Sequence, residues 1–279
     1  MTAQHPRAQL AQWGLRPKKR FGQNFLMDGK AAHRIARLCI SEEEAPDTRV
    51  LEIGGGTGAL THALLEAGAD VTVLEIDRDL VAMLRAREDI ASAHVVEADA
   101  MTFDYAAFAG DSPWRVAGNL PYNIATPLIM SLVEMERGPR SLTVMIQKDV
   151  AARLAAKPGT PAYGSLSVAV QYAMRVERAF TLGPNAFYPP PKVHSTVVQL
   201  TRLDEPAARP RDLALFRKVV RGAFAYRRKT LANSLMLALG YDRATVVRAL
   251  EACALAPEER GERLSLADFA KLADALAEG

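Results

Sequence analysis

Residues 51–60, LEIGGGTGAL, decide the fold, because they join an apolar run that predicts a β-strand to a run that predicts a helix. Gly54, Gly56 and Gly58 lie in the turn between the two. A glycine-rich turn at this place lets a ligand approach the backbone closely at the carboxyl edge of a parallel sheet. The spacing is G-x-G-x-G, not G-x-G-x-x-G, and the P-loop lysine is absent. A nicotinamide enzyme and an NTPase therefore fit less well.

Short β-branched runs alternate with helical segments from residue 49 to 147, which is typical of a parallel sheet covered by helices. The pattern predicts helices at 58–68 and 78–89, and strands at 49–54, 70–77, 93–99, 114–119 and 141–147. Two further runs, 165–176 and 194–203, bracket a proline-rich loop and are expected to close the sheet as a hairpin-like antiparallel edge. The expected fold is α/β and Rossmann-like, with a mainly parallel seven-stranded sheet.

The character of the chain changes at residues 204–212, DEPAARPRD, a polar linker that precedes helical periodicity. We therefore expect a basic N-terminal arm at residues 1–27, a cofactor-binding domain at 28–204 and a small α-helical domain at 205–279. The last helix is predicted within 264–277, where Ser265 and Asp268 have capping-box spacing.

Composition describes an ordinary globular protein: 279 residues, of which 49% are hydrophobic and 24% charged. Cys39 and Cys253 lie far apart, so neither a disulfide framework nor a zinc site is indicated, and a cytoplasmic location is expected. The histidines do not have metal-ligand spacing, so no metal is expected. No apolar stretch approaches the roughly 20 residues that span a bilayer.

Basic residues gather in two places, although the net charge is only +3. Residues 209–229 hold eight Lys or Arg and one acid. Before the first acid, Asp28, the N-terminus contains Arg7, Arg16, Lys18, Lys19 and Arg20. Both patches would attract phosphates and make binding salt-sensitive. A solvated helix face explains either patch alone, and a transit peptide weakly explains the first.

Acids stand at the ends of the next two predicted strands. Glu75 follows Gly54 by 21 positions, where a carboxylate can accept both ribose hydroxyls of an adenosine-type cofactor. Asp99 ends the third strand and can accept from the exocyclic amine of an adenine. Either acid alone is better explained as a helix cap or surface group. Their concurrence with the glycine turn at three successive strand ends favours a cofactor site.

The fourth strand ends in Asn119-Leu120-Pro121-Tyr122. Pro121 fixes φ and removes a backbone donor, so this stiff corner leaves neighbouring carbonyls without strand partners. The Asn119 side chain and the Leu120 carbonyl can both accept hydrogen bonds from adenine N6, and Tyr122 can stack on the base. A plain strand end with a core tyrosine explains an isolated Asn-x-Pro-Tyr, but the position after three cofactor-like strand ends favours a catalytic corner.

A second aromatic candidate lies in residues 185–198, NAFYPPPKVHSTVV. Its three consecutive prolines make the loop rigid, and Phe187 or Tyr188 can sandwich a flipped base against Tyr122. Packing in the core explains Phe187 equally well.

Several stretches together resemble the ribosomal RNA adenine N6-dimethyltransferases, a family of class I S-adenosylmethionine-dependent methyltransferases. They are RFGQNFL (20–26), LEIGGGTGALT (51–61), VLEIDRDL (73–80), EADAMTF (97–103), GNLPYNIATPL (118–128), AYGSLSV (162–168), NAFYPPPKV (185–193) and AFAYRRKTLANSL (223–235). They occur in the family's order from about residue 18 to 235, and the likeness is strongest to the bacterial small-subunit branch.

The resemblance implies that the cofactor is S-adenosyl-L-methionine. The residues it implies for cofactor contact are Asn24, Leu26, Gly54, Gly56, Glu75, Asp99 and Asn119; those for the target base are Asn119, Leu120, Tyr122 and Phe187. The implied reaction is N6,N6-dimethylation of two adjacent adenosines in the 3'-terminal hairpin loop of small-subunit (16S) rRNA, with a role in subunit biogenesis and in RNA binding by the helical domain. One departure is His194, where relatives carry Asp or Asn. We expect a monomer.

Three other functions remain open from the sequence. A resistance-type methyltransferase that acts on large-subunit rRNA shares the same corner. A non-catalytic ribosome-assembly or transcription factor can use the same scaffold, and a DNA adenine methyltransferase would act on naked duplex. Intact cofactor and corner residues disfavour the second of these.

Overall fold

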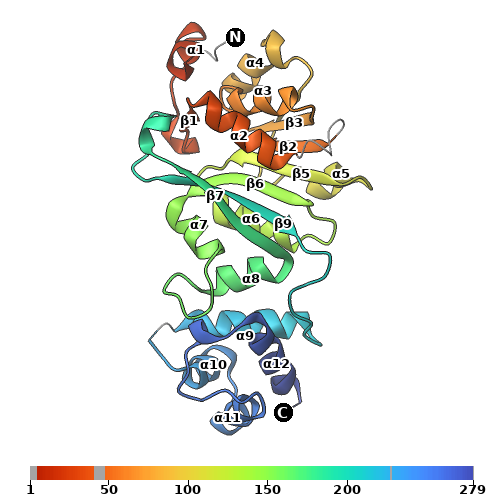
Figure 1. The fold of residues 1–279 in the computed structure, drawn as a ribbon, viewed down its shortest axis with the longest axis vertical. Coiled ribbons are helices and arrows are strands. Elements are labelled where there is room, and N and C mark those ends of the chain that lie inside the picture. Colours follow the sequence, from red (N-terminus) through yellow and green to blue (C-terminus); the bar gives the residue numbers. More distant parts are fainter. Residues whose placement is uncertain (1–4, 41–47, 227, 279) are drawn as a thin grey trace. The chain divides into compact units, whose positions relative to one another are not determined.

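The structure is a computed structural model that describes residues 5–40, 48–226 and 228–278. The described residues form two compact units (Figure 1). The first unit draws on residues 1–151 and 177–202, and the second on 152–176 and 203–279.

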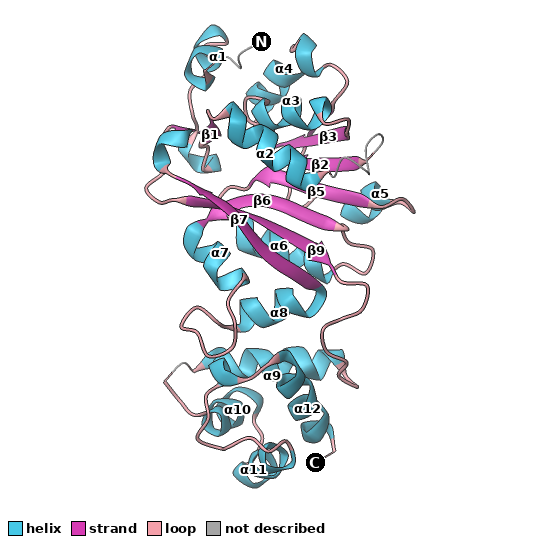
Figure 2. Ribbon diagram, in the orientation of Figure 1, coloured by secondary structure: helices cyan, strands magenta, loops and turns pink. Residues whose placement is uncertain are grey.

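The centre of the first unit is a sheet in which the described residues contribute seven strands, in the order β4-β3-β2-β5-β6-β9-β7 (Figure 2). The strands are β2 (Arg49–Ile53), β3 (Asp70–Glu75), β4 (His94–Glu97), β5 (Trp114–Asn119), β6 (Ser141–Gln147), β7 (Met174–Leu182) and β9 (Ser195–Arg202). Strands β4 to β6 pair in parallel, and β9 runs antiparallel to β6. The predicted mainly parallel, seven-stranded Rossmann-like sheet is confirmed.

Helices cover both faces of this sheet, with α2 in front of the strands and α6 behind them in Figure 2. The helices of this part of the chain are α1 (Pro6–Gln12), α2 (Gly29–Cys39), α3 (Ala59–Glu66), α4 (Arg78–Arg85), α5 (Tyr105–Ala109), α6 (Ala125–Glu134) and α7 (Lys148–Leu154). Asp28 caps α2 and Asp77 caps α4, each accepting from a free backbone N–H in the first turn. Apolar residues of α2 and α3, among them Ile35 and Leu64, are fully buried against the sheet.

The N-terminal arm packs onto the first unit through a short ladder in which β1 (Phe25–Leu26) pairs with β8 (Phe187–Tyr188). The Lys18 ammonium contacts the carboxylates of Asp77 at 2.5 Å and Asp79 at 2.6 Å. Gln23 donates to the same Asp77 at 2.8 Å. Lys18 therefore fastens the arm to the start of α4. Because its charge is already paired with two carboxylates, Lys18 is a poorer phosphate ligand than the sequence suggested.

The prediction of a strand at 165–176 is wrong for most of its length. Residues Ser165–Ala173 form a helix, α8, and the edge strand β7 begins only at Met174. The β-branched residues favour a strand, but the Gly164 N–H donates to the Ser167 hydroxyl and satisfies the helix start. Val168 is then fully buried in a helical core. Tertiary packing outweighs the local β-propensity here.

The second unit is helical and larger than the expected segment 205–279, because residues 152–176 pack with it. Tyr163 and Val168 are buried in the same core as Phe216 and Phe269, and the Tyr163 hydroxyl donates to the Leu264 carbonyl at 3.0 Å. The helices after α8 are α9 (Leu213–Ala225), α10 (Leu231–Leu239), α11 (Arg243–Ala252) and α12 (Leu266–Ala277).

The last helix begins as its sequence predicts. Ser265 caps α12, and the Asp268 side chain accepts from the Ser265 N–H at 2.9 Å, which completes the predicted capping box. Among the described residues no helix is both long enough and apolar enough to cross a membrane.

Candidate active site

A cavity lies where β2, β3 and β5 end, at the carboxyl edge of the parallel sheet. Because these strands are paired in register, their ends meet: the Gly54 N–H donates to the Leu74 carbonyl at 2.8 Å, and the Ala98 N–H donates to the Glu75 carbonyl at 3.0 Å. Ligands of open α/β sheets bind in this kind of crevice.

The glycine turn forms one wall of the cavity. Gly54 and Gly56 have φ of +82° and +55°, conformations that residues with a Cβ rarely adopt. The turn is held to the next strand because the Gly56 N–H donates to Glu75 Oε2 at 3.0 Å. Close approach of the neighbouring strands also depends on Gly118, where a Cβ would lie 2.5 Å from the Ile53 carbonyl oxygen.

Glu75 is 6% exposed and accepts two backbone hydrogen bonds, from the N–H groups of Gly56 and Asp77, both at 3.0 Å. Burial raises the pKa of Glu75, and the two hydrogen bonds oppose that shift by stabilising the carboxylate. Each carboxylate oxygen has two lone pairs, so acceptor capacity remains for a ligand. This fits the predicted hydrogen bonds to a pair of ribose hydroxyls.

Asp99 follows β4 and also lines the cavity. Its Oδ1 accepts from the Met101 N–H at 2.8 Å, which orients the exposed carboxylate. Ile76, 43% exposed, lines the same region and was not singled out by the sequence. An acceptor beside exposed apolar side chains suits the edge and face of a planar base.

The corner after β5 contains two acceptors, the Asn119 amide oxygen and the carbonyl of Leu120, a residue that lines the cavity although it is 1% exposed. Asn119 Nδ2 donates to the Asn24 carbonyl at 2.7 Å, which fixes the amide orientation and leaves Oδ1 as its acceptor. The Leu120 N–H donates to the Met145 carbonyl at 3.1 Å, and the Pro121 carbonyl accepts from the start of α6. Within the described part of the chain, no donor reaches Asn119 Oδ1 or the Leu120 carbonyl.

Tyr122 stands beside these acceptors and is half-buried. Its hydroxyl lies 2.8 Å from the Ser195 hydroxyl at the start of β9, so the ring is tied to a strand of the sheet. Burial raises the pKa of Tyr122, so the hydroxyl is neutral near pH 7.

The structure brings nearly all predicted site residues together. Those that line the one cavity are Asn24, Leu26, Gly54, Gly56, Glu75, Asp99, Asn119, Leu120 and Tyr122. Phe187 is the exception and does not line this cavity, so its contact with the base stays a prediction. It is 1% exposed, pairs with Leu26 in the β1–β8 ladder and packs in the core cluster that contains Leu26 and Ile35, two residues that do line the cavity.

Sequence reasoning missed Glu52, which also lines the cavity. Its side chain is 1% exposed, and Oε2 accepts from the Thr61 hydroxyl at 2.5 Å. Burial raises the pKa of Glu52 to about 8. The sequence did carry a signal, because a single acid stands inside the apolar run RVLEIG. Burying an ionised acid costs free energy unless it is paired, so an acid at such a position indicates a special role.

The cavity fits an adenosyl cofactor. A Cβ at Gly54 would enter the space between the loop and the Asn119 carbonyl oxygen, 3.7 Å away, so the absence of a side chain leaves room there. Glu75 and Asp99 supply carboxylates to hydroxyl and amine donors, while Ile76 supplies an apolar surface. Among the described residues, no cluster of three or more His, Cys, Asp or Glu is arranged to hold a metal ion.

The sequence pattern of the ribosomal RNA adenine dimethylase family matches residues 14–278. The chain belongs to this family. It is an rRNA adenine dimethyltransferase, and S-adenosyl-L-methionine is its methyl donor. The resemblance inferred from the motifs is thereby confirmed.

Two relatives show how far the similarity extends. A protein of Hahella chejuensis is 45% identical over 263 residues, 94% of this chain and 93% of that protein. A protein of Pseudomonas aeruginosa is 46% identical over 265 residues, 94% of this chain and 96% of that protein. Both are named ribosomal RNA small subunit methyltransferase A.

Solved structures agree on the fold. The 23S rRNA methyltransferase ErmE matches with a TM-score of 0.71 and 27% identity, covering 91% of this dimethyltransferase and 100% of that chain. A dimethyladenosine transferase from Plasmodium falciparum matches with a TM-score of 0.75 and 24% identity, covering 89% and 95%. The class I methyltransferase fold is confirmed.

Proposed function

We propose that this dimethyltransferase converts two adjacent adenosines in the 3'-terminal hairpin loop of small-subunit rRNA to N6,N6-dimethyladenosine, as a step in small-subunit assembly. The small subunit is supported by the names of the relatives at 45% and 46% identity. The likeness to ErmE, at 27% identity, makes large-subunit rRNA the second candidate substrate.

The observation that carries the mechanism is the pair of acceptors at Asn119 Oδ1 and the Leu120 carbonyl. Adenine N6 is a poor nucleophile because its lone pair is delocalised into the ring. Two acceptors that bind the N6 hydrogens favour a pyramidal nitrogen, which frees the lone pair. Bound S-adenosyl-L-methionine would supply an electrophilic methyl group: N6 would take the methyl as the carbon–sulfur bond breaks and S-adenosylhomocysteine leaves, and the methylated nitrogen, now cationic and acidic, would release its proton to water. Correct placement can contribute about 7–11 kcal/mol to such a reaction, and no strong general base is needed.

The same corner serves both transfers. After the first methylation, N6 keeps one hydrogen, so one of the two acceptors is enough to orient the nitrogen for the second. The Tyr122 ring stacks on the target base, a contact worth about 1–3 kcal/mol. The hydrogen bond between the Tyr122 and Ser195 hydroxyls holds the ring in place while the singly methylated base is positioned for the second transfer.

We assign the cofactor to the part of the cavity lined by the glycine turn and the ends of β3 and β4. The main chain of Gly54 and Gly56 allows close approach, Glu75 accepts the ribose hydroxyls and Asp99 accepts from the adenine amine. Phe187 acts indirectly in this proposal. It is the register partner of Leu26 in the β1–β8 ladder and so supports the segment whose Asn24 carbonyl orients Asn119.

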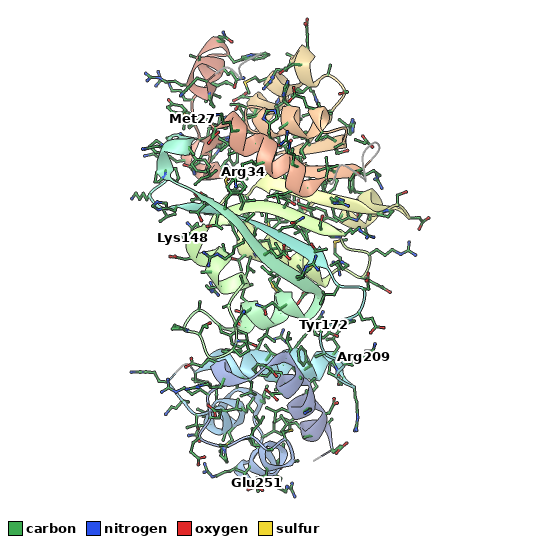
Figure 3. All side chains as sticks on the ribbon, viewed as in Figure 1. Met27, Arg34, Lys148, Tyr172, Arg209 and Glu251 are labelled. Carbon is green, nitrogen blue, oxygen red and sulfur yellow. The ribbon has the colours of Figure 1, made fainter. Side chains whose placement is uncertain are left out.

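We assign rRNA binding to exposed cations of the helical second unit. Arg209 and Arg211 pair with Glu205 and Glu278, which makes them poorer phosphate ligands; Figure 3 labels Arg209 on the loop before α9. Within the basic stretch 209–229, the exposed and described cations without such a carboxylate partner are Lys218, Arg221, Arg228 and Lys229. Arg227 lies outside the described residues. The same proposal has the enzyme act as a monomer in the cytoplasm, where its rRNA substrate is assembled.

Methyl transfer to defined substrates tests this function. The protein is incubated with radiolabelled S-adenosyl-L-methionine and, in parallel, unmethylated small subunits, unmethylated large subunits and duplex DNA, followed by nucleoside analysis. Dimethyladenosine formed with small subunits alone is the expected result. Transfer to large subunits would replace the proposal with the second candidate, and transfer to duplex DNA would contradict both.

A further inference from the structure

Arg87 lies directly behind the glycine turn, on the side away from the cavity. It follows α4, and its Nη1 donates a hydrogen bond to the Thr57 carbonyl. Thr57 is 4% exposed and lines the cavity, whereas Arg87 does not. The peptide that carries the Thr57 carbonyl therefore lies between the cavity and Arg87.

Gly58 makes this contact sterically possible. A Cβ at Gly58 would lie 2.7 Å from Arg87 Nη1 and 3.3 Å from its Cζ, so any side chain there would displace the guanidinium. Gly58 also has φ of +80°, a conformation that other residues rarely adopt. Gly58, the last glycine of the turn, thus leaves room for the arginine behind the loop.

A second residue fixes the guanidinium itself. Arg87 Nε donates to Asp89 Oδ1 at 2.9 Å, and Nη2 donates to Asp89 Oδ2. This two-point pair sets the plane of the guanidinium and directs Nη1 at the loop. Arg87 lowers the pKa of Asp89, so the pair stays charged at neutral pH. The Arg87 side chain is 19% exposed, so the pair is partly shielded from water.

The turn is consequently held from two directions. On the cavity side the Gly56 N–H donates to Glu75, and on the far side the Thr57 carbonyl accepts from Arg87. Glycine-rich segments lose more conformational freedom on ordering than others, so a loop without such supports would bind a ligand less tightly.

We propose that Arg87 is a positioning residue for the cofactor: it holds the Thr57 carbonyl and thereby keeps the glycine turn in the geometry that binds S-adenosyl-L-methionine. It acts through the loop backbone and touches neither the cofactor nor the target base. The inference concerns the cofactor half of the site and does not depend on which rRNA is methylated.

Arg85 provides a matched control. It stands two positions earlier and likewise donates to a backbone carbonyl, that of Val95, from Nε at 3.3 Å and Nη2 at 2.8 Å. Its acceptor belongs to β4, not to the glycine turn. If Arg87 contributed only to packing of this region, the variants Arg85→Ala and Arg87→Ala would behave alike.

The test measures binding of S-adenosylhomocysteine and S-adenosyl-L-methionine by calorimetry, thermal unfolding with and without ligand, and steady-state methyl transfer. For Arg87→Ala we expect about tenfold weaker binding, the fold-change of roughly 1.4 kcal/mol, with kcat at saturating cofactor changed less than about twofold. Arg85→Ala should lower the Tm without changing the Kd. Arg87→Lys should be intermediate because one ammonium cannot contact both Asp89 and Thr57 with the same geometry.

Asp89→Asn gives a milder variant should Arg87→Ala fold poorly. It keeps Arg87 but weakens the two-point pair, and about a two- to fivefold loss of affinity is expected. Wild-type affinity in both Arg87→Ala and Asp89→Asn would overturn the proposal, and so would an equal loss of affinity in Arg85→Ala. Since cofactor binding needs no RNA, a failure of the small-subunit assignment would leave these results unaffected.

Discussion

Asn119 Nδ2 donates to the Asn24 carbonyl at 2.7 Å, and this hydrogen bond joins the end of β5 to the N-terminal arm across 95 positions of sequence. It uses a side-chain donor at the corner and a main-chain acceptor in the arm. The orientation of Asn119 Oδ1, and so the corner's ability to bind an amine, depends on how the arm is seated. The ion pair of Lys18 with Asp77 and the β1–β8 ladder are what seat it.

Replacing Asn119 should have the largest effect on chemistry. Asn119→Ala removes one of the two acceptors for N6 and the hydrogen bond to Asn24. We expect kcat to fall by roughly 10²–10³-fold, the range for loss of one preorganised group that acts in the transition state. Single-turnover methyl transfer measures it. The control is Asn123→Ala, which changes an exposed asparagine four positions later and should retain activity. Full activity in Asn119→Ala would contradict the proposed role of the corner.

Two variants of Tyr122 distinguish the contribution of ring stacking from that of the hydroxyl hydrogen bond. Tyr122→Ala removes a base contact worth about 1–3 kcal/mol, so a loss of roughly 5- to 150-fold in kcat/KM for RNA is expected. Tyr122→Phe keeps the ring and loses only the hydroxyl pair with Ser195. It should lose less than about tenfold. Equal losses in the two variants would mean that the hydroxyl, and not the ring face, is what the reaction needs.

Cations of the helical unit that have no carboxylate partner should contribute more to RNA affinity than those that are already paired. The double variant Arg221→Ala/Arg228→Ala should weaken rRNA binding and reduce the slope of log K against log salt by about two. Arg209→Ala/Arg211→Ala is the matched control, because both arginines already contact carboxylates. Filter binding at several salt concentrations distinguishes them. Identical slopes in the two double variants would argue against the assigned surface.

The sequence predicted the sheet well because each of its parallel strands is a short apolar run followed by a turn, and such local patterns survive in the fold. It failed at 165–176, where the valines favour a strand while burial of Val168 in a helical core favours a helix. That burial is a long-range property. The membership of residues 152–176 in the helical unit could not be predicted for the same reason.

The site was predictable where its residues stand at strand ends, as Gly54, Glu75, Asp99 and Asn119 do, because pairing in register brings strand ends together. For Phe187 the loop motif could not say which way the ring turns, and the structure places it in the core. Arg87 could not be found either. Its role depends on a contact with a loop 30 positions away and on the space left by a glycine.

Phe187 therefore gives a decisive comparison. Its ring is 1% exposed, so Phe187→Ala should cost about 3–5 kcal/mol of unfolding free energy, as other buried aromatic truncations do. Phe187→Leu should cost less and keep most activity if the ring serves only the core. Denaturant unfolding and methyl transfer are measured on the same samples. Loss of activity in Phe187→Leu without loss of stability would restore the predicted contact with the base.

Glu52 should make stability depend on pH in an unusual direction. Burial raises its pKa to about 8, whereas a glutamate in an unfolded chain has its ordinary pKa of 4.5. Between these values the folded state holds a proton that the unfolded state has lost, so stability falls as pH rises. The slope from one such group is at most about 1.4 kcal/mol per pH unit, and Glu52 adds no slope below pH 4.5 or above pH 8.

The measurement is the free energy of unfolding in urea from pH 5 to pH 8. Glu52→Gln keeps an acceptor for the Thr61 hydroxyl but cannot ionise, so its stability should fall less steeply with pH than that of the wild type, and the two curves should diverge as pH rises. Glu75, whose pKa burial also raises, contributes a slope of the same sign in both proteins, and its charge helps to raise the pKa of Glu52. Glu134→Gln changes an exposed carboxylate on α6 and should follow the wild-type curve. Parallel curves for Glu52→Gln and the wild type would show that Glu52 releases its proton at the same pH in the folded and unfolded states, which would contradict the raised pKa.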